Sequence, residues 1–186
     1  MGKTYDRLDH RLKEFISKQK MFFVATAPMD AAGHVNVSPK GYDSFVVLGP
    51  TQVAYLDLGG SGIETQAHVQ ENGRITIMFC AFDGAANILR LYGRGEAIDF
   101  DHPEFEEMLA LFPGYDRARA IIRVDISRIQ DSCGWGVPFY EFKGEREQLK
   151  RWADNNELDA QGREKWREKN ARSIDGLPGL NGAKSS

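Results

Sequence analysis

The sequence predicts a mainly β protein with flanking helices, in which short strands form a closed or partly closed antiparallel sheet. Short apolar segments rich in β-branched and aromatic residues recur through most of the chain. Loops rich in Gly, Pro and Asp separate these segments. Helical periodicity is limited to the N-terminal region, two short internal segments and the C-terminal part. A chain of 186 residues can bury a full core as one domain.

Seven segments are predicted to be strands. Each is short, and each either alternates between apolar and polar residues or is rich in residues that favour strands. The predicted strands are Met21–Ala27, His34–Ser38, Ser44–Leu48, Gln52–Leu58, Arg74–Ala81, Ile88–Ile98 and Ala120–Ile129. Short strands at this spacing are typical of antiparallel barrels and sandwiches.

Three helices are predicted to flank the strands. Apolar residues at helical spacing near the N-terminus predict an amphipathic helix over about residues 5–18, with Thr4 as its N-cap. Two shorter helices are expected at about Ile63–Glu71 and Pro103–Leu111. The second of these begins with a proline, which the first turn of a helix tolerates.

The composition changes after Gly144. Residues 145–172 contain 8 Lys or Arg and 7 Asp or Glu, with thin apolar stripes near Trp152 and Trp166. This pattern predicts two surface helices that dock weakly on the barrel or on a partner chain. We therefore divide the chain into a barrel domain (residues 1–144), a helical extension (145–180) and a disordered tail (181–186).

Composition argues against several classes of partner. The formal net charge is −3, so the chain has no basic excess for binding a nucleic acid. No apolar window is long enough to span a membrane, and the polar N-terminus does not resemble a signal peptide. Two distant cysteines, Cys80 and Cys133, and four scattered histidines predict reduced thiols and no metal site. We expect a cytoplasmic location.

The segment 33–41 is the first candidate binding segment. Alternate residues of a strand share a face, so Val35 and Val37 are expected to point into the core. The opposite face offers an amide, a hydroxyl and an ammonium, which suit a polyol phosphate or a heterocycle with hydrogen-bonding edges. That face holds His34, Asn36, Ser38 and Lys40. Pro39 lacks an N–H and so marks an edge or a bulge. The alternative is a solvated strand face followed by a turn.

The segment Asp57–Thr65 runs from a predicted strand into a predicted helix through three glycines. Free backbone N–H groups at a helix N-terminus bind phosphate, and glycine allows an anion to come close. Ser61 and Thr65 add hydroxyls. The segment matches neither the Walker pattern nor the dinucleotide-binding GxGxxG pattern. The alternative is a flexible turn in which Ser61 is the N-cap.

Two further segments carry groups that could bind a ligand. Arg90 and Arg94 share one face of a strand, where they could hold an anion or pair with acidic neighbours such as Glu96. Trp135 lies between two glycines, so its indole is expected in a loop, where it could either stack on a flat ligand or anchor the loop to the barrel. The sequence contains no catalytic triad or paired carboxylates, a pattern typical of proteins whose cofactor supplies the chemistry.

Four segments occur in the same order as in a known family and resemble it together. They are Val35–Gly41, Asp57–Thr65 with Asn72–Ile75 after its helix, Arg90–Gly95 and Cys133–Pro138. They resemble the pyridoxamine 5'-phosphate oxidase-like FMN-binding proteins over about residues 5–142. The segment Asn170–Pro178 looks like the tail of one uncharacterised branch of that family.

The resemblance implies a six-stranded antiparallel split β-barrel that forms a homodimer with FMN at the interface. The strand at residues 36–40 would line the flavin, with Lys40 toward the phosphate or the isoalloxazine edge. Trp135 would lie near the flavin, from either the same subunit or the other. The cofactor-binding residues predicted in this way are Asn36, Val37, Ser38, Pro39, Lys40, Ser61, Gly62, Ile63, Thr65, Arg90 and Trp135.

The chain departs from the classical oxidases at two places. Those enzymes carry an Arg-Lys pair where this chain has Gly62-Ile63, so Lys40, Arg90 or backbone dipoles must balance the phosphate charge. They also carry a C-terminal Arg-x-His clamp for pyridoxamine phosphate, which is absent here, so oxidation of that substrate is not expected.

The sequence therefore predicts an FMN-dependent oxidoreductase of unknown small-molecule substrate, with no catalytic side chain identified. The alternatives are a non-catalytic flavin carrier or redox sensor, or a split barrel that binds haem or a deazaflavin.

Overall fold

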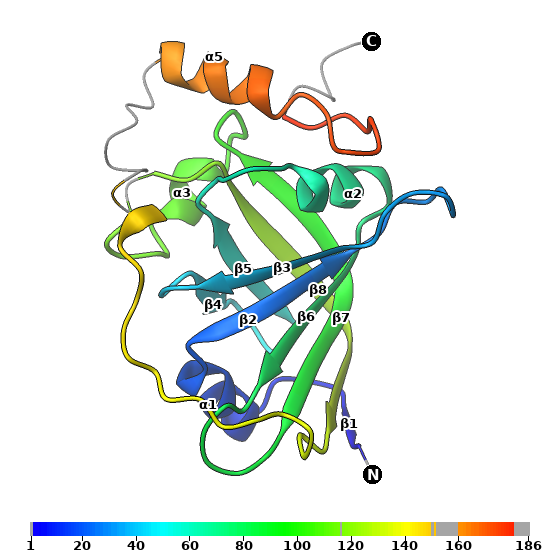
Figure 1. Cartoon of the computed structure of the whole chain (residues 1–186), viewed down its shortest axis with the longest axis vertical. Coiled ribbons are helices and arrows are strands. Elements are labelled where there is room, and N and C mark those ends of the chain that lie inside the picture. Colours follow the sequence, from blue (N-terminus) through cyan, green and yellow to red (C-terminus); the bar gives the residue numbers. More distant parts are fainter. Residues whose placement is uncertain (1, 116, 150, 152–159, 181–186) are drawn as a thin grey trace.

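A computed structural model describes residues 2–115, 117–149, 151 and 160–180 of the chain (Figure 1). One antiparallel sheet forms the body of the protein, and helices lie at its ends. The strands are β1 (Thr4–Tyr5), β2 (Met21–Thr26), β3 (Asn36–Gly41), β4 (Phe45–Val47), β5 (Gln52–Asp57), β6 (Arg74–Cys80), β7 (Ile88–Asp99) and β8 (Ala120–Ser132). The helices are α1 (His10–Lys18), α2 (Glu64–Asn72), α3 (Phe105–Leu109) and α5 (Ala160–Lys169).

The sheet curves into a half-barrel with the strand order β3-β2-β6-β7-β8-β5-β4. Strand β1 lies off this path and pairs with β8. The predicted antiparallel fold is confirmed, but the expected count of six strands is wrong because the sheet has eight. Six of them have six residues or more, and β1 and β4 have only two and three. Strand β3 is an edge of the sheet, as Pro39 predicted.

The first helix begins later than the sequence predicts. Tyr5 pairs with Ile129 in the sheet instead of opening a helix. Asp9 is the N-cap of α1, because its side chain accepts a hydrogen bond of 2.8 Å from the Leu12 N–H. The expected cap at Thr4 is therefore wrong, since a two-residue strand leaves no periodic signal in the sequence.

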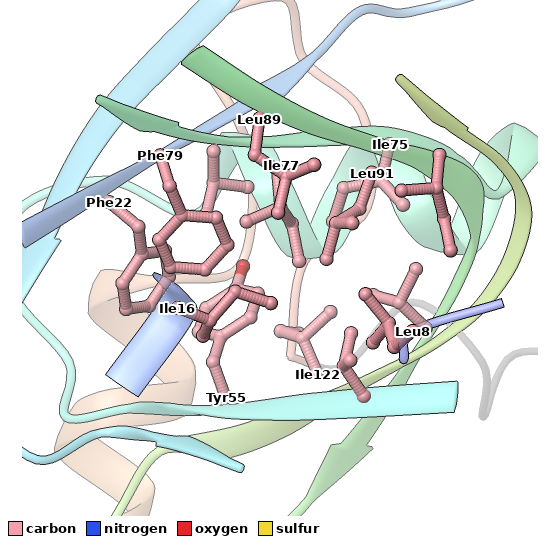
Figure 2. Packing of buried hydrophobic residues seen from close by; sticks show 14 of the residues in the cluster. Leu8, Ile16, Phe22, Tyr55, Ile75, Ile77, Phe79, Leu89, Leu91 and Ile122 are labelled. Carbon is pink, nitrogen blue, oxygen red and sulfur yellow. The ribbon is translucent and has the colours of Figure 1, made fainter. Parts of the chain in front are cut away.

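Two apolar clusters fill the two sides of the sheet. Figure 2 shows the first, inside the curve, where Phe22, Tyr55, Phe79 and Ile122 are among the labelled side chains. The second lies on the other face of β5 and β8 and includes Leu56 and Ile121 together with residues of α3 and α5. Strands β5 and β8 are thus buried on both faces, whereas the outer face of β3, β2 and β6 has no such cover.

Val35 and Val37 lie on this uncovered outer face, with 71% and 61% of their surface exposed. The prediction that they point into the core is wrong. Their polar neighbours take the inner side: Ser38 pairs with buried Val24, and Lys40 pairs with buried Phe22. Opposite residues of paired strands share a face, so Asn36, Ser38 and Lys40 lie on the inner side of the edge strand.

The C-terminal extension contacts the rest of the protein through α5 and the residues after it. Trp166 of α5 is buried against Phe100, with ring centroids 6.3 Å apart. Arg167 forms an ion pair with Asp101 at 2.7 Å. Residues 170–180, which we call the C-terminal segment, lie beside α2 (Figure 1). Trp166 and Arg167 thus dock α5 on the rest of the protein, as predicted for one of the two C-terminal helices. The apolar stripe predicted near Trp152 and the predicted tail at 181–186 lie outside the described residues.

None of the helices in the described ranges has the length and apolar character needed to cross a membrane.

Candidate functional site

The polar side of β3 and the glycine-rich segment meet in the folded protein. Asn36 Nδ2 donates a hydrogen bond of 2.9 Å to Thr65 Oγ1 in the first turn of α2. At the other end of β3, Lys40 Nζ lies 4.0 Å from Asp57 Oδ1, where β5 ends. Residues 58–63, which we call the glycine turn, connect these two points. Two segments that are distant in sequence thus form one candidate site.

Three charged groups lie at the base of this site. Asp57 is 2% exposed, and Arg119 Nη2 donates to its Oδ2 at 2.8 Å. Burial alone would raise the pKa of Asp57, but the charges of Arg119 and Lys40 outweigh it and lower the pKa from 3.8 to about 2. Two cations therefore share one carboxylate. Arg119 is buried in contact with Asp57, whereas the Lys40 side chain is 22% exposed and can meet a further anion.

The glycine turn presents backbone groups to solvent. Gly59, Gly60 and Gly62 have φ values of 88°, 139° and 105°, which favour glycine over residues with a Cβ. The N–H groups of Gly60, Ser61 and Gly62 have no partner within the described part of the chain. Ile63 is the N-cap of α2 and forms no side-chain cap bond, so the alternative in which Ser61 caps the helix is wrong. Such a turn can donate to an anion.

One acidic residue, Glu64, disfavours the binding of an anion at this position. Glu64 lies in the first turn of α2, and its Oε1 accepts a hydrogen bond of 3.3 Å from the Ile174 N–H. Its charge offsets the surplus charge of Lys40 and the positive end of the helix dipole. Lys40 and the backbone N–H groups of the glycine turn are therefore the groups at this site that could hold an anion.

Asn36 is occupied inside the protein. Its Nδ2 donates to Thr65 and, at 3.4 Å, to Thr26 Oγ1, and its Oδ1 accepts from Ser38 Oγ at 3.3 Å. The Thr26 hydroxyl lies 3.0 Å from Nδ1 of buried His68. Burial lowers the pKa of His68, so the ring is neutral at pH 7. Asn36 thus fastens β3 to α2, and Ser38 and Lys40 are the side chains of this row that remain for a ligand.

The other predicted residues of these two segments occupy different environments. Thr65 is buried beneath Asn36, and the Ile63 side chain is buried in the second core cluster. Ser61 and Gly62 are exposed on the glycine turn. Val37 and Pro39 are exposed on the outer face of the sheet.

Arg90 and Trp135 lie away from this site within one copy of the chain. Arg90 pairs with Met78, three strands and roughly 14 Å from Pro39. It lies on the outer face, and its Nη1 donates to Ser132 Oγ at 3.0 Å. Trp135 is 87% exposed and follows the far end of β8, whose first residue pairs with Asp57. Across the sheet, Asp131 near that end of β8 lies four strand spacings, or roughly 19 Å, from Lys40, and Trp135 follows four residues later.

Residues 8–133 match the model of the family named Pyridoxamine 5'-phosphate oxidase. The chain belongs to this family. A family member from Aspergillus flavus, the protein ustO, is 38% identical over 195 residues, covering 96% of this chain and 78% of the relative. The matched region includes both β3 and the glycine turn and ends before the C-terminal extension.

Solved structures show the same fold. A variant of HupZ from Group A Streptococcus has a TM-score of 0.56 at 22% identity, covering 67% of this chain and 99% of that one. A protein named as a putative pyridoxamine 5'-phosphate oxidase from Lactobacillus delbrueckii has a TM-score of 0.51 at 17% identity, covering 67% and 94%. The half-barrel of this family member is therefore shared with known split-barrel structures.

Two buried residues of this family member were missed by the sequence reasoning. Arg119 is the single charge within the apolar run Ala118–Ile122, and buried arginines are almost always paired, so that run contained a usable signal. Asn170 is buried and bonds to Arg119 at 2.8 Å. Its contact spans 51 residues and left no local signal.

An open cleft of about 1900 Å³ begins beside the site. It lies between α1, the β6–β7 loop and residues 139–146, and Gly41 and Tyr42 form part of its wall. Gly41, the last residue of β3, is the part of this strand that borders the cleft. The cleft is larger than a typical small-molecule pocket of roughly 300–1000 Å³.

Proposed function

We propose that this protein binds FMN between two copies of the chain and acts as a flavin-dependent oxidoreductase on a small organic molecule. The observation that carries the proposal is the convergence of Lys40 and the glycine turn, in a member of the pyridoxamine 5'-phosphate oxidase family. An ammonium beside free backbone donors suits the phosphate of the cofactor.

The uncovered outer face supports a homodimer. Val35 and Val37 are exposed there, next to the half-buried side chains of Phe23 and Met78 on β2 and β6. A contiguous apolar surface of this kind indicates a protein partner. In one copy, Arg90 lies on the opposite face of the sheet from Lys40, and Trp135 lies beyond the end of β8, four strands away. A second copy would let both complete the site, and each dimer would then hold two equivalent sites.

Each residue has a definite task in this proposal. Lys40 and the N–H groups of the glycine turn would hold the phosphate, and the Ser38 hydroxyl would bond to the ring system or its ribityl chain. Trp135 of the second copy would cover the flat face of the ring and exclude water. FMN, when bound, supplies the transfer of a hydride or of electrons. The side chains position the cofactor and substrate and shield them from solvent.

The substrate we propose is not pyridoxamine phosphate. The sequence lacks the Arg-x-His clamp of the classical oxidases. The C-terminal segment instead packs against α2, with Ile174 bonded to Glu64. The unpaired thiols of buried Cys80 and exposed Cys133 suit the reducing cytoplasm, where we place the protein.

The spectrum of the purified protein and an FMN titration test this function. We expect absorbance near ~450 nm that dithionite bleaches, and a dissociation constant that rises about tenfold or more in Lys40→Ala. Lys13→Ala, which removes an exposed lysine of α1 that does not line the cleft, is the matched control and should bind normally. A colourless protein that ignores added FMN would refute the proposal.

Further measurements separate the alternatives. Turnover with reduced nicotinamides and common acceptors distinguishes an enzyme from a flavin carrier or sensor. A Soret band would identify haem, and mass spectrometry of the released cofactor would identify a deazaflavin.

A further inference from the structure

A buried polar cluster links the C-terminal segment to the glycine turn. Arg119 Nη1 donates to Asn170 Oδ1 and to the Gly62 carbonyl, both at 2.8 Å. Arg119 Nη2 donates to Asp57 Oδ2 at the same distance. Asp57, Arg119 and Asn170 are all buried. One guanidinium thus holds the end of β5, the glycine turn and the C-terminal segment together.

Asn170 is itself held in place. Its Nδ2 donates to the Trp166 carbonyl at 2.8 Å, and its own carbonyl accepts from the Leu180 N–H at 3.1 Å. The C-terminal segment also passes close to the turn, because a Cβ added to Gly179 would meet the Ile63 side chain at 3.0 Å. Asn170 is therefore a fixed point against which Arg119 is oriented.

The cluster also determines how much of the Lys40 charge is available to a ligand. Arg119 neutralises Asp57 from inside, which leaves the more exposed Lys40 with a surplus positive charge. If Arg119 moved away, Lys40 would be the cation left to pair with Asp57. The negative charge of Glu64 would then make the electrostatic potential at the turn unfavourable for an anion. A buried pair of this kind is often no more stabilising than apolar residues of equal volume, so its particular contribution is to position groups.

We propose that Asn170 is a positioning residue for the cofactor site: it orients Arg119, which fixes the glycine turn through Gly62 and leaves Lys40 free to hold the FMN phosphate. The C-terminal segment, outside the region that matches the family model, thus completes the site where this chain lacks an Arg-Lys pair. This inference rests on the proposed function.

The test compares Asn170→Ala with Trp166→Phe in the full-length chain. Trp166→Phe disturbs the same packed helix but leaves the Trp166 carbonyl and Arg119 unchanged, so it reports a purely structural effect. For each variant, FMN affinity is measured by fluorescence quenching and melting temperature by scanning fluorimetry. Hydrogen–deuterium exchange with mass spectrometry follows the amides of Gly59 and Ala67, which donate to Asp57 Oδ1 and to the Ile63 carbonyl at the two ends of the turn. We expect Asn170→Ala to weaken FMN binding about five- to tenfold and to speed the exchange of these two amides. Trp166→Phe should lower the melting temperature while its affinity stays within about twofold.

Three results would refute the positioning role of Asn170 or distinguish its failure from that of the proposed FMN binding. Unchanged affinity and exchange in Asn170→Ala would refute the positioning role. An equal loss of affinity in Trp166→Phe would show that helix packing alone supports the site. If the unaltered protein binds no FMN, the proposed function is wrong, whereas the exchange of the Gly59 and Ala67 amides still decides whether Asn170 holds the turn.

Discussion

Replacing Asp57 with Asn should both destabilise the protein and remove a defined part of its dependence on pH. Asp57 is buried with Arg119 at 2.8 Å, so the substitution leaves a buried guanidinium without its counter-charge. Breaking a buried pair in this way costs about 3–5 kcal/mol. The expected loss in free energy of unfolding at pH 7 is of this size, which for a chain of this length lowers the melting temperature by roughly 10 °C.

The pH dependence follows from the lowered pKa of Asp57. Its pKa falls from 3.8 to about 2 on folding, a difference of about 1.8 pH units, which corresponds to about 2 kcal/mol. Because the folded pKa is the lower one, this stabilisation is present above pH 3.8 and is lost as the pH falls through 2. Most of it has gone by pH 2.5. The stability difference between the native protein and Asp57→Asn should therefore narrow by between about 1 and 2 kcal/mol between pH 6 and pH 2.5.

Urea unfolding at pH 6, 4, 3 and 2.5, followed by circular dichroism, measures this difference. Asp125→Asn is the control, because Asp125 is an exposed carboxylate that accepts a hydrogen bond from Gln52. Its difference from the native protein should stay small at every pH. A constant difference for Asp57→Asn across the range would show that Asp57 carries no lowered pKa and would refute the charge balance described for the site.

Three further predictions address the ligand and the second copy. Glu64→Gln should tighten FMN binding about fivefold in a titration at low salt, because it removes a negative charge from the first turn of α2; weaker binding would contradict this. Val37→Glu should convert the dimer to a monomer in sedimentation, while Thr51→Glu, at an exposed turn, should not; a dimer that persists in Val37→Glu would exclude the outer face as the interface. Lys40→Ala and Trp135→Ala should each lose flavin, but refolding an equal mixture should restore about a quarter of the sites, since half of the dimers are mixed and each has one intact site. Failure to recover any flavin would place both residues in the same copy's site or outside it.

The sequence predicted most strands because alternation and β-branched residues report local conformation. It misplaced Val35 and Val37 for a related reason: an apolar residue on a strand predicts burial, but not whether the cover is the core or another chain. The first helix was extended into β1 because Tyr5 fits a helical spacing, and only the long-range pairing with Ile129 decides otherwise.

About half of the candidate site could be predicted from the sequence. Lys40 and the glycine turn could be identified because each lies within a short motif. Arg119 and Asn170 act on that turn from 57 and 108 residues beyond Gly62, so only the fold brings them to it. The buried polar cluster therefore illustrates a general limit: a motif shows which groups could bind a ligand, whereas the residues that hold the motif in place are set by tertiary contacts.

The position of Lys40 on an edge strand gives a physical reason for a two-copy site. Among the described residues, none pairs with the outer side of strand β3, and none covers the adjoining face of β2 and β6. An exposed strand edge beside an exposed apolar face favours association with another chain. A two-fold dimer can bury the edge and the face together. The same operation can bring the far end of β8, with Trp135, toward Lys40 of the other copy. The cofactor site and the interface would then be stabilised by the same contacts, so flavin content and dimerisation should rise and fall together across the variants described above.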